Sequence, residues 1–409
     1  MSKIIALSEV EGRSWGYWLL LGGLALIIGV ALLAAYYMES NGHYVTGMTN
    51  QIAWGTPHVF AVFLIVAASG ALNVASISSV FGRSAYKPLA PFSGLLAIAL
   101  LAGGLAVLVL DLGRPDRLIV AMTSYNFKSI FAWNIFLYTG FFAVVGAYLW
   151  MMMERRMNSH ARSAGMIAFI WRLTLTTGTG SIFGFLVARQ AYDAAVMAPL
   201  FIAMSLSFGT AIFILALVAS YSWTNRPLGD FIVRRLKNLM GIFIAVVLYF
   251  TVVQHLTNLY ATEHHGVERF ILLEGGVHTL LFWGGQVLLG GLAPLALVYH
   301  PATANSRKWT LAAALMVILG GFAQVYVIII GGQAFPLALF PGMEVSSSFF
   351  DGAVNQYAPS LPEAALGLGG VAIAGLIVAL AVKVLRFLPV TLADEEVDPH
   401  HMVNTNLHK

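Results

Sequence analysis

Titratable side chains at the edges of long apolar stretches are the residues of this sequence that could carry out chemistry. His58 follows Trp54-Gly55-Thr56-Pro57 at the start of one such stretch, and Asp111 ends the charge-free run from Leu89 to Leu110. Ionisable groups are expensive inside a membrane, so each one retained there is a candidate functional residue. Imidazole and carboxylate groups transfer protons, and histidine does so near neutral pH. His58 and Asp111 therefore predict proton exchange with a bound molecule.

Four charges within seven residues follow the apolar run, in Asp111-Leu112-Gly113-Arg114-Pro115-Asp116-Arg117. The glycine and the proline stop the helix here. One interpretation is a structural clasp in which two carboxylates brace two guanidinium groups. The other is a wall of a site for a polar head group just inside the lipid boundary, with Asp111 and Arg114 ordering that site. The two interpretations are compatible, because a clasp can also shape a pocket.

Other polar and aromatic residues are predicted at a similar depth. Glu274 and His278 are four residues apart on one helix face, so they could also simply pair with each other. Each histidine taken alone could be an ordinary hydrogen-bonding residue between helices, and interfacial aromatics are commonly belt residues. Together, imidazoles, carboxylates, amides and indoles suit a quinone head, whose two carbonyls need donors and whose redox chemistry moves two protons. The candidates are His58, Asp111, Arg114, Trp54, Tyr125, Trp133 and Asn134 for the quinone pocket, and His255, Glu274 and His278 for a second polar cluster.

The composition predicts an all-α, polytopic membrane protein. Of the 409 residues, 59% are hydrophobic and only 10% are charged, whereas soluble proteins carry about a quarter charged residues. There is no cysteine, which excludes thiolate-bound iron–sulfur clusters, c-type haem attachment and disulfides in this chain. Haem b bound by two of His58, His255 and His278 stays open as an alternative to quinone, and no metal site is predicted.

Ten stretches are long enough to cross a bilayer, which takes about 20 apolar residues. We expect helices two to five (57–188) and six to nine (196–333) to form two four-helix bundles, with helices one and ten outside them. Residues 334–362 would be a periplasmic loop. The ten predicted spans are 17–38, 57–80, 89–110, 129–152, 165–188, 196–220, 238–262, 270–299, 309–333 and 363–388.

The lysines and arginines orient the helices. Sixteen lie in the two tails, the even-numbered links and the last turns of the tenth span, five lie in the odd-numbered links, and Arg172 lies inside the fifth span. The positive-inside rule then predicts cytoplasmic tails at 1–16 and 389–409 and places His58 and Asp111 near the outer face. None of the eighteen acidic residues falls in the cytoplasmic half of a predicted span. Proton exchange with the outer side is therefore predicted, and a complete carboxylate relay across the membrane is not.

The run Leu110–Arg117, followed by Asn126, Phe127, Ser129 and Trp133, resembles the NrfD/polysulfide-reductase (PsrC-like) family of integral membrane subunits. The Trp54-Gly55 pair and the link from Gly82-Arg83 to Pro88-Leu89 fit the same pattern, and the length is most similar to the DsrP type. The resemblance implies two four-helix bundles, a quinone site near the outer face and electron exchange with a periplasmic iron–sulfur subunit. Asp111 and Arg114 match the charged motif of the family, and His58 lies about one turn from the position of its quinone-binding histidine.

The sequence is thus interpreted as a quinone/quinol-interacting subunit of a respiratory or sulfur-metabolism redox complex. We expect menaquinone or ubiquinone as cofactor, and a bacterial inner membrane as location. Expected partners are an iron–sulfur subunit, a cytochrome and further membrane subunits. The alternatives are a secondary transporter, which would show polar groups at the midplane of interrupted helices, and a membrane anchor without chemistry of its own.

Overall fold

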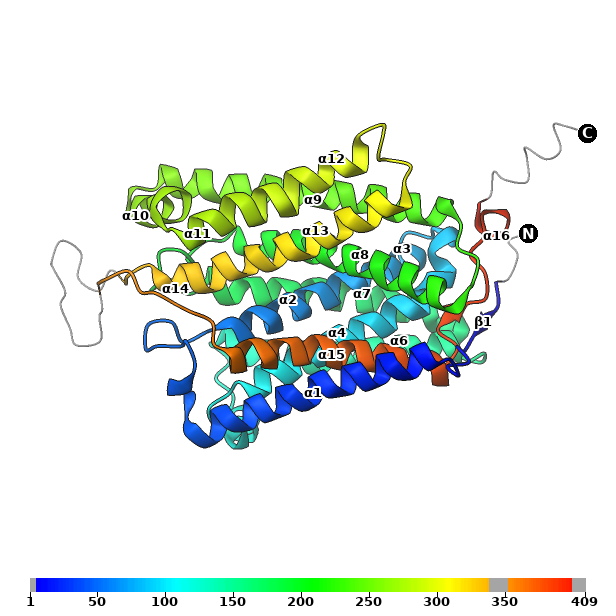
Figure 1. Cartoon of the computed structure of the whole chain (residues 1–409), viewed down its shortest axis with the longest axis horizontal. Coiled ribbons are helices and arrows are strands. Elements are labelled where there is room, and N and C mark those ends of the chain that lie inside the picture. Colours follow the sequence, from blue (N-terminus) through cyan, green and yellow to red (C-terminus); the bar gives the residue numbers. More distant parts are fainter. Residues whose placement is uncertain (1–4, 338–351, 399–409) are drawn as a thin grey trace, which may run out of the picture.

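The computed structural model describes residues 5–337 and 352–398. Part of the predicted outer loop, 338–351, and the end of the predicted C-terminal tail, 399–409, lie outside these ranges. Long helices dominate the described residues and run roughly parallel to one another (Figure 1). This follows from the composition, because in lipid the backbone amides must bond within their own segment.

Nine helical segments of the described residues are long and apolar enough to cross a membrane, and they correspond to nine of the ten predicted spans. They are α1 (Trp15–Asn41), α2 with α3 (Thr56–Ser79), η2 with α4 (Ser84–Leu110), α6 (Ile130–Met153), α8 (Met197–Thr224), α9 (Asp230–Tyr260), α11 to α12 (Val277–Tyr299), α13 to α14 (Arg307–Ala334) and α15 (Leu361–Val384).

The remaining predicted span, 165–188, forms α7 (Ala161–Gly184). Arg172 and several threonines lower the apolar character of this helix, so it is not among the nine segments above. Its 24 residues rise by about 36 Å at about 1.5 Å per residue, which exceeds the thickness of a bilayer core. It lies alongside the other long helices, in contact with both α6 and α8 (Figure 1).

Short elements connect the long helices. The described part of the second half of the chain also contains three runs of π-helix. The short elements are η1 (His43–Val45), η3 (Pro115–Arg117), α5 (Leu118–Thr123), η4 (Asn158–His160), η5 (Thr262–His264), α10 (His265–Arg269) and α16 (Asp394–Val397); the π-helical runs are η6 (Phe270–Glu274), η7 (Leu281–Leu292) and η8 (Val327–Gly331).

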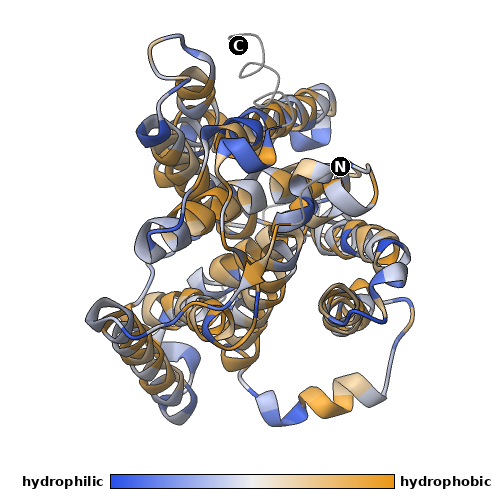
Figure 2. Ribbon diagram, turned by 90° about the vertical axis from the view of Figure 1, so that its right-hand side faces the viewer, coloured by the Kyte–Doolittle hydropathy of each residue, from blue (hydrophilic) through white to orange (hydrophobic). Residues whose placement is uncertain are grey.

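The helices pack in two groups around α2 and α8. In the first helix group, α2 packs on α4, and α6 packs on α4 and α7; in the second, α8 packs on α9 and α13, and α13 packs on η7. Contacts of α2 and α7 with α8 join the groups, and one continuous set of buried apolar residues runs through both. Helix α1 packs mainly on α15 and is otherwise exposed. Figure 2 shows the ribbon of the long helices mostly in the colours of hydrophobic residues, as expected for surfaces that face lipid.

A two-stranded sheet joins the two terminal segments at one end of the helices, on the right in Figure 1. Strand β1 (Leu7–Ser8) pairs antiparallel with β2 (Leu388–Pro389), and the Tyr221 hydroxyl donates to the Pro389 carbonyl. We call this the sheet end. At the opposite end, which we call the site end, α2 begins, α4 ends and α9 ends.

Candidate functional site

His58 and Asp111 meet at the site end. Nδ1 of His58 lies 2.7 Å from Oδ2 of Asp111, with side-chain exposures of 17% and 1%. This is ion-pair distance, although the atoms do not meet hydrogen-bond geometry. Both carboxylate oxygens of Asp111 are buried without a hydrogen-bond partner among the described residues. Since a buried carboxylate without donors is costly, the pair is suited to receive a donor from a bound molecule or water.

The local sequence explains why these two side chains meet. Gly55 is the N-cap of α2 and Pro57 stands in its first turn, where a missing amide hydrogen costs nothing. His58 is therefore held in the first turn of α2. Asp111 is the C-cap of α4, and α2 and α4 pack against each other in opposite directions. Two residues 53 positions apart are thus brought to one end of the same helix pair.

Gln333 and Arg189 fix the loop before α2. Trp54 donates its amide hydrogen to Oε1 of Gln333 (3.0 Å), and Nε2 of Gln333 donates to the Trp54 carbonyl (2.9 Å). Arg189 donates to the carbonyls of Gln51 and Gln333. Burial lowers the pKa of Arg189. These bonds lock the approach of the chain to His58.

A buried carboxylate also supports the start of α2. The Tyr357 hydroxyl lies 2.5 Å from Oε1 of Glu363 and accepts the amide hydrogen of Thr56 at 2.7 Å. Oε2 of Glu363 accepts from the amides of Gly47 and Ser360. Burial, and next the hydrogen bond to Glu363, raise the pKa of Tyr357, so this phenol stays protonated.

An aromatic wall stands beside the pair. The rings of Trp54 and His58 are stacked with centroids 6.0 Å apart. Trp54 also contacts Phe131, Phe183 and Tyr192. Flat rings at this position suit an aromatic ligand head.

Arg114 lies away from His58 and Asp111. Its Nε and Nη2 bond the carboxylate of Asp116 at 3.1 Å each, and both side chains are more than 60% exposed. The hydrogen bond from Arg114 lowers the pKa of Asp116. The charged motif thus divides into an exposed clasp, Arg114–Asp116, and a buried functional candidate, Asp111.

The other residues predicted for the pocket take separate places. Tyr125 stacks on Phe136 with centroids 4.3 Å apart, and the Trp133 indole donates to the Phe127 carbonyl. Both aromatics lie outside the contacts of Trp54. Asn134 is buried and donates to the carbonyls of Ile130 and Gly178, which joins α6 to α7. On α6 it is Phe131 that contacts Trp54, a residue the sequence reasoning missed.

The predicted second cluster has a different membership. Nδ1 of His255 lies 2.6 Å from Oε2 of Glu268, whose Oε1 accepts from Asn258 at 2.8 Å. Glu274 instead pairs with Arg269 at the surface, at 2.6 Å. His278 is buried beside Tyr326, and its Nδ1 lacks a partner among the described residues. The acid that accompanies His255 is therefore Glu268, which the sequence reasoning did not single out.

The sequence reasoning missed two buried acids, Glu363 and Glu268, and only one of them carries a recognisable sequence signal. Ser360 and Glu363 form a capping box, and the Ser-x-x-Glu spacing of such a box is visible in a sequence. Glu268 stands in the charged segment Glu263–Arg269 and looks like a link residue. Its burial follows only from the packing of α10 on α9.

The residues at His58 and Asp111 fit a quinone better than a haem. A partly exposed imidazole, a buried carboxylate without donors and a flat indole match a ring with two oxygen atoms that gain and lose protons. His58 and His255 each approach a different carboxylate through Nδ1. Neither pairing resembles two imidazoles facing a shared iron.

Comparison with known proteins identifies the family. The sequence matches the family described as "Polysulphide reductase, NrfD" over residues 44–338, which is more than half of the chain. The chain belongs to the NrfD family.

Relatives of this NrfD protein are membrane subunits of redox enzymes. An "Hdr-like menaquinol oxidoreductase integral membrane subunit" of Archaeoglobus fulgidus is 27% identical, over 96% of this chain and 99% of the relative. A putative dimethyl sulfoxide reductase membrane subunit of Halobacterium salinarum is 26% identical, over 93% and 92%. A "Menaquinone reductase, integral membrane subunit" of Nitratidesulfovibrio vulgaris is 22% identical, over 89% and 90%.

Proposed function

We propose that this chain is the quinone-interacting membrane subunit of a multi-subunit redox complex, and that His58 and Asp111 form its quinone site. The buried Asp111 carboxylate, which lies 2.7 Å from His58 and has no hydrogen-bond donor among the described residues, is the observation that carries the proposal. The names of the relatives support it, since two of them contain menaquinol or menaquinone. Menaquinone is accordingly the quinone we favour over ubiquinone.

Each residue has a distinct proposed role. A bound quinone supplies two-electron, two-proton chemistry at its ring oxygens. His58 presents Nε2 to the ligand, because Nδ1 faces Asp111, and Nε2 takes up or returns a proton. Asp111 stabilises the imidazolium form of His58 and fixes its orientation. Trp54 stacks beside the imidazole and walls the ring.

The electrons are proposed to pass to or from a partner subunit at the site end. This chain has no cysteine to hold iron–sulfur clusters. We propose a periplasmic iron–sulfur subunit at this position, with a cytochrome and further membrane subunits in a respiratory or sulfur-metabolism complex of a bacterial inner membrane. The first and second helix groups would act as two four-helix bundles within that complex.

Turnover of the assembled complex tests the proposal. We expect His58→Gln and Asp111→Asn each to lower quinol turnover by about 10²-fold or more, the contribution typical of a positioned acid–base group. Asp116→Asn is the matched control, because it makes the same change of side chain in an exposed acid that pairs with Arg114 and not with His58. Unchanged turnover in both variants of the pair would leave the chain as a membrane anchor and overturn the proposal.

A further inference from the structure

A second buried histidine–carboxylate pair lies outside the proposed quinone site. Glu268 is fully buried, with a relative exposure of 0%, and the side chain of His255 is 14% exposed. Their contact resembles that of His58 and Asp111, since Nδ1 of histidine again faces the acid, here at 2.6 Å. Glu268 comes from α10 and His255 from α9, so the pair belongs to the second helix group.

The surroundings of Glu268 favour a proton over a metal cation as the ligand. One carboxylate oxygen faces Nδ1 of His255, and the other accepts from the Asn258 amide. Metal ions such as Ca²⁺ and Mg²⁺ need free oxygen ligands, whereas here nitrogen atoms occupy both sides of the acid. Nε2 of His255 is the remaining position at which this group can gain or lose a proton.

Two small cavities continue from His255 into the membrane interior. The first, which we call the outer cavity, holds about 20 Å³ and is lined by Gln254, His255, Gln286 and Gln324 among others. The second, the inner cavity, holds about 10 Å³, includes Thr251 and shares Gln286 and Gln324 with the first. A cavity needs roughly 10–15 Å³ to hold one water. Each cavity therefore has room for about one water.

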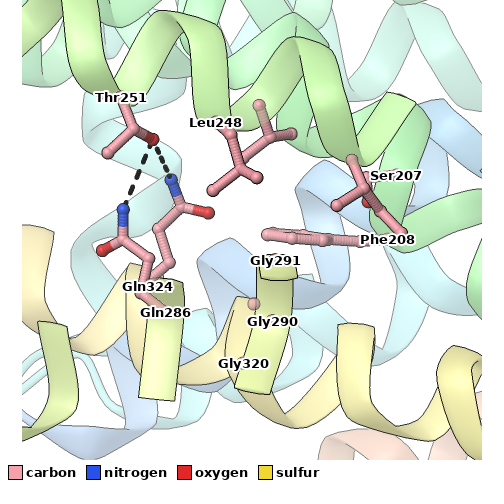
Figure 3. A pocket seen from close by; sticks show the side chains of 12 residues that line it. Ser207, Phe208, Leu248, Thr251, Gln286, Gly290, Gly291, Gly320 and Gln324 are labelled. Carbon is pink, nitrogen blue, oxygen red and sulfur yellow. Dashed lines mark hydrogen bonds between the residues drawn. The ribbon is translucent and has the colours of Figure 1, made fainter. Parts of the chain in front are cut away.

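Figure 3 shows the inner cavity from close by. Gln286 and Gln324 both point their amide nitrogens at the Thr251 hydroxyl, at 3.4 and 3.5 Å. Thr251 stands one helical turn before His255 on α9, farther from the site end. Polar groups thus extend from the buried pair towards the middle of α9.

The side chains around His255 are mostly uncharged, and Glu268 is the charged group that contacts it. Helix α10 contributes Glu268, η7 contributes Phe282 and Gln286, α13 contributes Gln324, and α8 and η8 contribute apolar side chains. Among the described residues that line the outer cavity, His255 is the titratable one. Two of these walls, η7 and η8, are π-helical, and π-helical turns are frequent at functional sites.

We propose that His255 and Glu268 form a proton-binding site of the second helix group, which exchanges its proton through water held in the two cavities. When the site is loaded, an imidazolium ion faces the Glu268 carboxylate. When the site is empty, a neutral imidazole keeps its Nδ1 hydrogen on Glu268, and the proton has left from Nε2 to water. The site goes beyond the proposed quinone chemistry and requires neither a quinone nor another protein chain.

Titration of the histidine rings in the full chain tests the site. The chain, with ¹⁵N-labelled histidine, is placed in lipid nanodiscs without quinone, and the His255 signal is assigned by His255→Gln. We expect the ring signals to show an imidazolium form on acidification, and Glu268→Gln to make that form harder to populate, because a neighbouring carboxylate favours the imidazolium form. A ring that keeps one protonation state at every pH measured, or that responds identically in Glu268→Gln, overturns the proposal.

A second measurement keeps the test decisive if Glu268→Gln does not fold. Gln286→Leu removes a polar wall common to both cavities, and Gln356→Leu is the matched control in an exposed loop. We expect exchange of the His255 ring proton with water to slow at least several-fold in Gln286→Leu only. Equal exchange rates in the wild type and both variants would contradict the water route.

Discussion

At the scale of single residues, the chemistry of this chain depends on where each carboxylate finds its donors. Glu268 and Glu363 are buried with donors on both oxygens, whereas Asp111 is buried beside His58 and has no hydrogen-bond donor within 5–337 and 352–398. A carboxylate whose oxygens are satisfied stabilises the fold or holds a neighbour, and an unsatisfied one has capacity for a ligand. This difference assigns Asp111, and not the equally buried Glu363, to the proposed quinone site.

Replacement of Tyr357 by Phe provides a pH-dependent test of the support under α2. The variant leaves one oxygen of Glu363 without its hydroxyl partner, which costs about 1–3 kcal/mol of unfolding free energy. The folded state raises the pKa of Tyr357 above the ordinary value of 10.0. The wild type therefore has this stability in full below about pH 10, and loses it as the unfolded chain ionises at higher pH.

The measurement is the unfolding midpoint of wild type and Tyr357→Phe in detergent from about pH 8 to 11. We expect the difference between them to be largest below about pH 10 and to narrow above it. Tyr44→Phe, at a residue that is 82% exposed, should show a small difference at every pH. A constant difference for Tyr357→Phe across the whole range would contradict this account.

The sequence predicts features of single residues when their causes lie in neighbouring residues. His58 and Asp111 could be singled out because glycine and proline, in Gly55-Thr56-Pro57 and at Gly113, mark the helix ends where they stand. Their meeting and the absence of other donors among the described residues are properties of packing. The run of four charges predicts Arg114 at the same site as Asp111, yet the Arg114 side chain is exposed and pairs with Asp116 instead.

At the scale of helices, close backbone contact holds the two helix groups together. Gly70 on α2 and Gly209 on α8 face each other, and a Cβ at either position would collide with backbone atoms of the other helix. Small residues of this kind allow transmembrane helices to pack closely. The sequence predicted the spans well because their apolar lengths are local properties. It could not predict which glycine faces which helix.

Gly70→Ala should therefore weaken the contact between α2 and α8. Because backbone atoms leave no room for the added methyl group, we expect a loss of about 1–3 kcal/mol in stability, the usual cost of overpacking. Gly22→Ala on α1 is the matched control, since nothing lies near a Cβ there. The comparison is made by thermal unfolding in detergent. Equal midpoints for the two variants would show that the contact between α2 and α8 accommodates the added methyl group without loss of stability, and would contradict this prediction.

At the scale of the whole molecule, both terminal segments lie at the sheet end and the His58–Asp111 pair lies at the other. The lysine and arginine count predicts that the sheet end faces the cytoplasm. The proposed partner and the proposed quinone site would then lie on the outer side, whereas the two cavities beside the proposed proton site would extend inward from it. Proton release and electron transfer on one side of the membrane would conserve no energy within this chain alone.

Because the chain has no cysteine, single introduced cysteines test this orientation without background. Ser124 after α5 and Ser159 in η4 are both exposed, at the site end and the sheet end respectively. In intact cells or outside-out vesicles, we expect a membrane-impermeant thiol reagent to label Ser124→Cys directly, and to label Ser159→Cys only after the membrane is opened. The reverse pattern would place His58 and Asp111 at the cytoplasmic face, and the proposed periplasmic partner could then not reach them.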